Sequence, residues 1–168
     1  MDLSTREKNF AKYYSYITAN PEYLKLKGIP RHGSTDTYEH SIRVGYAAYR
    51  LAKRMGVDPE SAARVGLLHD FCLINYQDKT KEDCKSRPWY CLHHPEEAAA
   101  NGELHFGLSK EEQDAIRSHM FPLAVHVPKS RLALVLTLAD KKVASVEGAA
   151  GAKHFAGKVG RQLRKGFD

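Results

Sequence analysis

An all-α fold with a single helical bundle is the structure that this sequence predicts, and three observations favour it. Apolar residues recur every three or four positions through most of the chain, which is the period of an amphipathic helix. We find no convincing alternation of apolar and polar residues of the kind expected for a half-buried strand. Helix-start signals, each a capping residue followed three positions later by Glu, occur at Ser4-Glu7, Asp36-Glu39 and Ser109-Glu112.

The composition restricts the class of protein further. A length of 168 residues is typical of one domain with one core. The three cysteines, Cys72, Cys84 and Cys91, are an odd number without a CxxC pair, which argues against a disulfide framework and favours a cytoplasmic protein. No run approaches the roughly 18 apolar residues of a membrane span, and the N-terminus lacks a signal-peptide pattern. The net charge of +6 suits an anionic substrate, nucleic acid or a basic tail equally.

Four helices are expected in the first half of the chain, each beginning at a capping residue or a proline. They run from Ser4 to about Ala19, from Asn20-Pro21 to Gly28 and Pro30, from Asp36 to about Met55, and from Asp58-Pro59 to His69-Asp70.

The second half begins with a segment that has no clear period. We interpret residues 71–92 as a loop over the functional site with some helical turns. The helices expected after it run from His94-Pro95 to Asn101-Gly102, from Ser109 to near Pro122, and from about Ser130 to Val146. The stretch from Gly148 mixes glycines with Lys and Arg, and we expect a loosely ordered basic tail there.

Six polar side chains stand beside apolar residues, where an imidazole or a carboxylate is not expected unless something binds it. They are His40, His69, Asp70, His94, His119 and Asp140. Each histidine alone would also suit a core histidine that hydrogen-bonds a neighbour. Six such residues from separate helices are typical of ligands shared by one or two metal ions, because His and carboxylate groups suit transition metals.

Asp140 is the most informative of these positions. Its helix is apolar all round, and Leu132, Leu136 and Val143 share its face. A carboxylate there must be paired, protonated or bound to a metal, and a salt bridge to a buried Arg is the alternative to a metal. Lys141 follows directly in the sequence, so on a helix it points away from Asp140.

The order His40, His69-Asp70, Asp140 resembles the H…HD…D signature of the HD-domain superfamily of metal-dependent phosphohydrolases. The local contexts are similar as well: Glu39-His40-Ser41, Gly66-Leu67-Leu68-His69-Asp70 and Leu138-Ala139-Asp140-Lys141. The resemblance covers about residues 33–146, and the ordered combination is its most specific part. It implies an HD-fold helical bundle with N-terminal helices over residues 1–30, a metal-binding domain over 31–147 and the basic Gly-rich tail over 148–168.

The resemblance also implies a ligand set. His94 and His119 fall where the dinuclear branch of the superfamily has two further histidines, and His93 competes with His94 for one of these places. Two ions would be bridged by Asp70, with His69 and Asp70 as the catalytic residues. If His94 and His119 do not bind, the site is mononuclear and they line the substrate pocket. The cofactor is then one or two divalent ions of Fe, Mn, Co, Ni or Zn.

One departure from the family affects the substrate site. Many HD phosphohydrolases have a lysine four positions after the motif histidine, and this chain has Leu73 there. A phosphate group would therefore need other contacts. Our candidates for substrate binding are Arg31, Lys79, Lys81, Lys142 and His93, although surface cations are more often solvated.

The expected function is hydrolysis of a small phosphorylated metabolite or nucleotide, as a phosphomonoesterase or a phosphodiesterase, by a metal-activated hydroxide. Two alternatives stay open: an HD-type di-iron oxygenase and a non-catalytic nucleotide-sensing protein. We expect no membrane partner and no nucleic-acid partner, and a homodimer is left open. The tail has too few aromatic residues to stack bases.

Overall fold

A computed structural model describes residues 2–31, 35–73, 87–124 and 126–165, with the backbone alone for 87–91 and 151–165. These ranges contain eight helices and no strand, which confirms the all-α prediction. In chain order the helices are α1 (Thr5–Tyr13), α2 (Ser15–Thr18), α3 (Pro21–Leu24), α4 (Thr37–Met55), α5 (Pro59–Leu68), α6 (Arg87–Phe106), α7 (Lys110–Ser118) and α8 (Arg131–Lys165).

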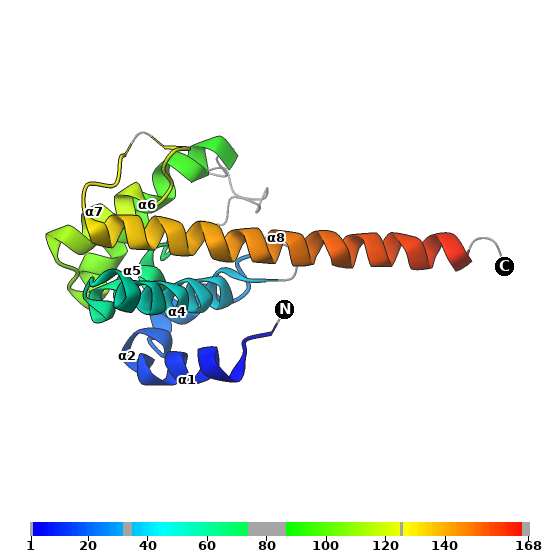
Figure 1. Cartoon of the computed structure of the whole chain (residues 1–168), viewed down its shortest axis with the longest axis horizontal. Helices are drawn as coiled ribbons and strands as arrows, with labels where there is room; N and C mark the ends of the chain where they lie inside the picture. The colour runs from blue at the N-terminus through cyan, green and yellow to red at the C-terminus, as the bar shows by residue number, and fades with distance from the viewer. Residues whose placement is uncertain (1, 32–34, 74–86, 125, 166–168) are drawn as a thin grey trace.

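Helix α4 lies at the centre of the arrangement, with α5 and α8 packed against it. Helices α1 and α2 lie on the side of α4 away from α8, while α7 packs against α5 and α8, and α6 packs against α7 (Figure 1). The interior between these helices is apolar; Ile42, Leu67, Ile116 and Leu136 are fully buried in one cluster. The helices that contain the motif residues therefore meet around a single core.

The capping residues expected from the sequence start the helices as predicted. The Glu7 and Glu112 amides donate to the hydroxyls of Ser4 and Ser109, and both glutamates accept from the amide of their capping serine. The Asp36 carboxylate accepts from the amide of Glu39 at 2.8 Å, and α4 begins at the next residue, Thr37. This cap places His40 in the first turn of α4, facing the interior.

Two glycines allow α4 and α5 to approach closely. A Cβ atom added at Gly66 would lie 2.6 Å from the Cα atom of Gly45, closer than two such atoms can approach. At Gly45 an added Cβ would instead meet the side chain of Leu67 at 2.9 Å. The helices are thus in backbone contact where α5 ends, and this contact brings the end of α5 beside the first half of α4.

The N-terminal segment differs from the single helix expected up to about Ala19. It breaks at Tyr14, and α2 begins at the next residue. The Tyr14 ring is buried beside Phe10, and its hydroxyl donates to the Glu60 carboxylate of α5 at 2.9 Å. The Thr18 hydroxyl donates to the Ala11 carbonyl at 2.7 Å across the break. These contacts with other parts of the fold stabilise the break more than a continuous helix would, and helical periodicity does not predict them.

Helix α6 begins at Arg87, so the prediction that a helix starts at His94-Pro95 was wrong, and the helix also extends past Asn101-Gly102 to Phe106. Pro95 lies inside it. Proline is common at the first position of a helix and costly inside one, so the local rule favoured a start at this point. Most of the expected loop over the site, residues 74–86, lies outside the described residues.

Helix α8 corrects the expectation of a loosely ordered tail, because it continues past Val146 to Lys165, and its C-terminal part extends beyond the other helices (Figure 1). No proline interrupts residues 148–165, and Ala, Lys, Arg, Gln and Leu favour a helix there against the glycines. None of the helices in the described part of the chain has both the length and the apolar character needed to cross a membrane.

Candidate metal centre

Two of the six residues predicted as metal ligands lie on α4 and α8 and face each other. His40 lies in the first turn of α4, and Asp140 lies on α8. Both are buried. The Nε2 atom of His40 is 3.2 Å from Oδ1 of Asp140.

The His69-Asp70 pair follows directly on α5, with His69 as the C-terminal cap of that helix. Both side chains are fully buried. The Nε2 atom of His69 is 3.1 Å from Oδ2 of Asp70 and 3.6 Å from Oδ1 of Asp140. The end of α5 therefore completes a group formed by His40, His69 and Asp140, whose ligand atoms lie within 4.8 Å of one another.

The other two predicted histidines lie on the opposite side of Asp70. His94 of α6 places its Nε2 atom 3.2 Å from Oδ1 of Asp70 and 3.1 Å from Nε2 of His119. His119 is the C-terminal cap of α7, and its Nε2 atom is 3.9 Å from the same oxygen. His69, Asp70 and His119 form a second group that could hold a metal ion.

The two carboxylate oxygens of Asp70 thus face different sets of histidines. Oδ2 lies toward His69 and, at 3.7 Å, toward His40, whereas Oδ1 lies toward His94 and His119. All six side chains singled out from the sequence meet in one buried place. Asp140 has His40 and His69 as its partners among the described residues, rather than the buried Arg that was the alternative.

The chemistry of these atoms fits a bound cation. The Nδ1 atoms of His69 and His119 donate to the Gly66 and Ile116 carbonyls at 2.9 and 2.7 Å, which leaves a lone pair on each Nε2 directed inward. Nε2 of His69 and Oδ1 of Asp70 are buried without a hydrogen bond, while Oδ2 of Asp70 is ion-paired with Arg31 at 2.6 Å. Buried acceptors that face other acceptors are costly, and a divalent cation between them removes this cost.

In the metal-free protein, the buried histidines and carboxylates of this centre shift one another's pKa values. Burial lowers the pKa of His69, but the charges of Asp70 and Asp140 outweigh burial and raise the pKa to about 10. Burial raises the pKa of both carboxyl groups. The charges of Arg31 and His69 hold the pKa of Asp70 well below its usual range, and hydrogen bonds from His40 and His69 do the same for Asp140. Burial, together with the charges on His69 and His94, lowers the pKa of His119 to about 3.

These shifts predict how the stability of the metal-free protein depends on pH. The raised pKa of His69 stabilises the fold below the unfolded value near 6.5, and this contribution is lost as the pH rises toward 10. The lowered pKa of His119 has the opposite effect, because the unfolded chain takes up a proton that the fold rejects as the pH falls from 6.5 toward 3. We expect the free energy of unfolding in the presence of a chelator to peak at about pH 6–7. Urea titrations from pH 4 to 10 measure it, and a steady rise from pH 7 to 10 would contradict the assignment for His69.

The predicted substrate-binding residues are distributed differently. Arg31 reaches the centre, where its Nη2 atom is 2.6 Å from Oδ2 of Asp70. His93 precedes His94 on α6 and is exposed, and Lys142 is exposed in a separate pocket of about 370 Å³ between α4 and α8. Lys79, like Lys81, lies outside the described residues. Arg31 is thus the candidate that the fold brings to the group of six predicted metal ligands.

Two residues at the centre were missed in the sequence. Glu147 of α8 accepts from Nδ1 of His40 at 2.8 Å, and Arg43 of α4 lies 2.8 Å from the other oxygen of Glu147. Both side chains are buried. A signal was present, because Glu147 is two helical turns after Asp140 and Arg43 is one turn after His40, on the same faces.

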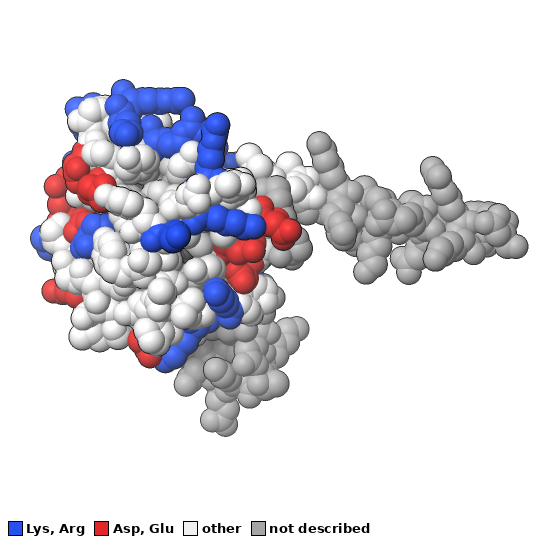
Figure 2. Space-filling model, turned by 90° about the horizontal axis from the view of Figure 1, so that it is seen from below, with Lys and Arg blue, Asp and Glu red and all other residues white. Residues whose placement is uncertain are grey.

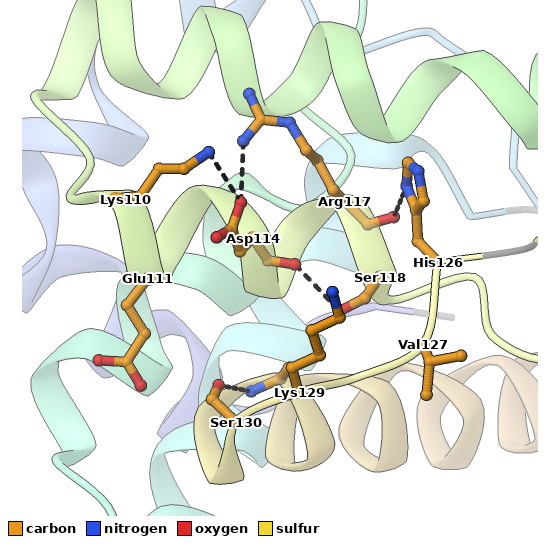
Figure 3. Close-up of a pocket in the computed structure, with 10 residues that line it drawn as sticks. Lys110, Glu111, Asp114, Arg117, Ser118, His126, Val127, Lys129 and Ser130 are labelled. Atoms are coloured by element: carbon orange, nitrogen blue, oxygen red, sulfur yellow. Dashed lines mark hydrogen bonds and ion pairs between the residues drawn. The ribbon is translucent and has the colours of Figure 1, made fainter.

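A second pocket, of about 620 Å³, lies between α7 and the segment leading into α8, and none of the six centre residues lines it. Figure 3 shows Lys110 and Arg117 pointing toward Asp114, at 3.0 and 3.3 Å. Arg117 also pairs with Glu96 at 2.7 Å. Because these exposed charges neutralise one another, the pocket offers no group comparable to the buried centre.

Comparison with known proteins identifies the family. The model of the HD-domain family matches residues 37–145, from the first residue of α4 into α8. No curated protein and no solved structure matches the chain. The matched segment spans more than half of the sequence and includes His40, His69-Asp70 and Asp140. The chain therefore belongs to the HD-domain family.

Proposed function

We propose that this protein is a metal-dependent phosphohydrolase that cleaves a phosphomonoester or phosphodiester bond in a small phosphorylated metabolite or nucleotide. The HD domain is typical of a superfamily of metal-dependent phosphohydrolases, and the buried His and Asp clusters could hold a metal. The reaction on phosphate esters and the presence of two ions are our proposals.

The observation that favours this function most is the place of Asp70 between two sets of imidazoles. Its Oδ2 atom faces His40 and His69, and its Oδ1 atom faces His94 and His119. A carboxylate with its two oxygens so divided is suited to bridge two cations. Divalent Fe, Mn, Co, Ni or Zn at such ligands would activate water for attack and neutralise the phosphoryl oxygens.

The residues around the centre have separate tasks under this proposal. His40, His69, Asp70 and Asp140 would hold one ion, while His94, His119 and the second oxygen of Asp70 would hold the other. Arg31 is ion-paired with Asp70 at 2.6 Å, so a cation bound at this carboxylate competes with its guanidinium. A released Arg31 would lie beside the centre with planar donors that match a phosphoryl group.

On the face seen in Figure 2, the distribution of charge favours a small substrate over nucleic acid. On the face shown in Figure 2, Lys and Arg side chains lie in separate groups with Asp and Glu near them. Binding a nucleic-acid backbone requires a continuous basic surface, because each phosphate contact releases counterions. The buried centre instead suits a single phosphoryl group.

The test begins with protein purified without oxygen, whose metal content is measured by elemental analysis. The same protein is then assayed against a panel of phosphomonoesters and phosphodiesters with each of the five metals. We expect hydrolysis of at least one class that requires added or retained metal and is removed by a chelator. Metal-loaded protein that cleaves no phosphate ester in the panel would contradict the proposal.

An oxygen-uptake assay with iron-loaded protein separates the proposed hydrolase from the di-iron oxygenase that uses a similar ligand set. Hydrolysis by the zinc- or manganese-loaded protein without oxygen is expected. Iron-dependent oxygen consumption with candidate substrates, without phosphate release, would favour the oxygenase. If the protein binds nucleotides but leaves them chemically unchanged, the result would favour the sensing role.

A further inference from the structure

His40 differs from His69 and His119 in how its ring is held. His69 and His119 cap helices at their C-terminal ends, where backbone carbonyls lack intrahelical partners and can accept from Nδ1. His40 lies in the first turn of α4, where the backbone carbonyls already accept hydrogen bonds from the amides of the next turn. Its Nδ1 atom must therefore be satisfied by a side chain, and that side chain is Glu147, at 2.8 Å.

The carboxylate of Glu147 determines which nitrogen of His40 keeps its proton when a metal binds. A carboxylate can only accept, so Nδ1 donates to Glu147 at 2.8 Å. Nε2, which lies 3.2 and 3.7 Å from oxygens of Asp140 and Asp70, is then the nitrogen that would give up its proton to a metal. Arg43 holds the other oxygen of Glu147 at 2.8 Å and compensates its buried charge.

We propose that Glu147 is a positioning residue of the metal centre, which acts through His40 and is itself held by Arg43. It keeps His40 in the orientation and tautomer in which Nε2 can bind a metal. Partners of this kind on metal-binding histidines contribute about 10- to 100-fold in metal affinity. The proposal rests on the metal centre described above, and its test measures metal binding in the absence of substrate.

Glu147→Gln is the sharpest variant because of the neighbouring arginine. Arg43 only donates, so it retains the Gln carbonyl oxygen and turns the amide NH₂ toward His40. This NH₂ donates to Nδ1, which forces the proton onto Nε2, the atom that should bind the metal. We expect zinc affinity, measured by calorimetry, to fall by about 10- to 100-fold. Glu147→Ala should also lose affinity, because it leaves the ring unheld.

Glu112→Gln provides a matched control. Glu112 is a buried carboxylate whose Oε1 atom pairs with Arg64 at 2.8 Å, in the way that Glu147 pairs with Arg43, but it contacts none of the six centre residues among its described partners. Both variants lose the charge of a buried carboxylate beside an arginine. Only Glu147→Gln should lose zinc affinity, whereas a merely structural role would lower the unfolding temperature of both and leave zinc affinity unchanged in both.

A measurement on the unchanged protein keeps the proposal testable if the variants do not fold. In zinc-loaded wild-type protein, nitrogen-15 NMR should show His40 with Nε2 on the metal and a slowly exchanging proton on Nδ1. Zinc on Nδ1 of His40, or equal zinc affinity in wild type and Glu147→Gln, would overturn the proposal. If wild-type protein binds zinc but cleaves no phosphate ester, only the proposed function is lost; if it binds no metal, both are lost.

Discussion

Asp70→Asn is expected to remove most of the bound metal and to lower turnover by about 10³-fold, the scale on which the loss of one strong electrostatic stabiliser lowers kcat. The reason is the position of Asp70 between the two sets of histidines. Asparagine has nearly the same shape but lacks the charge, and it replaces one acceptor with a donor. Elemental analysis of the purified variant and steady-state kinetics with saturating metal measure both effects.

The matched control for this prediction is Asp114→Asn. Asp114 is an exposed carboxylate on α7 that pairs with Lys110 and Arg117 at the surface. It should keep full metal content and full turnover, since exposed ion pairs contribute little. His69→Ala should behave like Asp70→Asn. Full metal content in folded Asp70→Asn and His69→Ala protein would mean that the buried cluster is not the metal centre.

Gly66→Ala is expected to have the largest effect on stability. The new Cβ atom would meet the backbone of α4, 2.6 Å from the Cα atom of Gly45, so the two helices must separate. Such overpacking costs about 3 kcal/mol, and the helix propensity of Ala returns about 1 kcal/mol. The net loss of about 2 kcal/mol corresponds to a fall of about 4–8 °C in Tm. Thermal unfolding with a chelator present measures the change.

The same substitution should also weaken metal binding, because the Gly66 carbonyl accepts from Nδ1 of His69. Gly102→Ala is the control: its Cβ atom would meet the end of the Leu108 side chain, at 2.4 Å, rather than a backbone. A leucine can change its rotamer, so this substitution should cost less than Gly66→Ala and leave metal binding unchanged. If the two variants unfold at the same temperature, the close approach of α4 and α5 does not determine the stability cost of Gly66→Ala.

Most helix starts and the six centre residues could be predicted from the sequence because their signals are local. Ser4, Asp36 and Ser109 are capping residues that satisfy amides within three positions, so each can be recognised without the fold. Asp140 was recognised because a carboxylate on an apolar helix needs a partner wherever that helix packs. In addition to these local signals, the order of His40, His69-Asp70 and Asp140 along the chain indicated the family.

The places where the prediction was wrong depend on contacts between distant segments. The break in the N-terminal helix at Tyr14 follows from the hydrogen bond between the Tyr14 hydroxyl and Glu60 of α5. Pro95 lies inside α6, and rules based on neighbouring residues do not anticipate a proline there. The partnership of Glu147 with His40 joins residues on α8 and α4, so it requires knowing how these helices pack.

The sequence by itself determined the helical class, most helix starts and the set of polar residues that need a common partner, because periodicity, capping and the cost of burial act over a few residues. Only the tertiary structure decided that Asp70 lies between two pairs of imidazoles, that Arg31 alone of the described substrate candidates reaches it, and that Glu147 holds His40. Those relations depend on how closely α4, α5 and α8 approach, which the glycine contact and the shared core set.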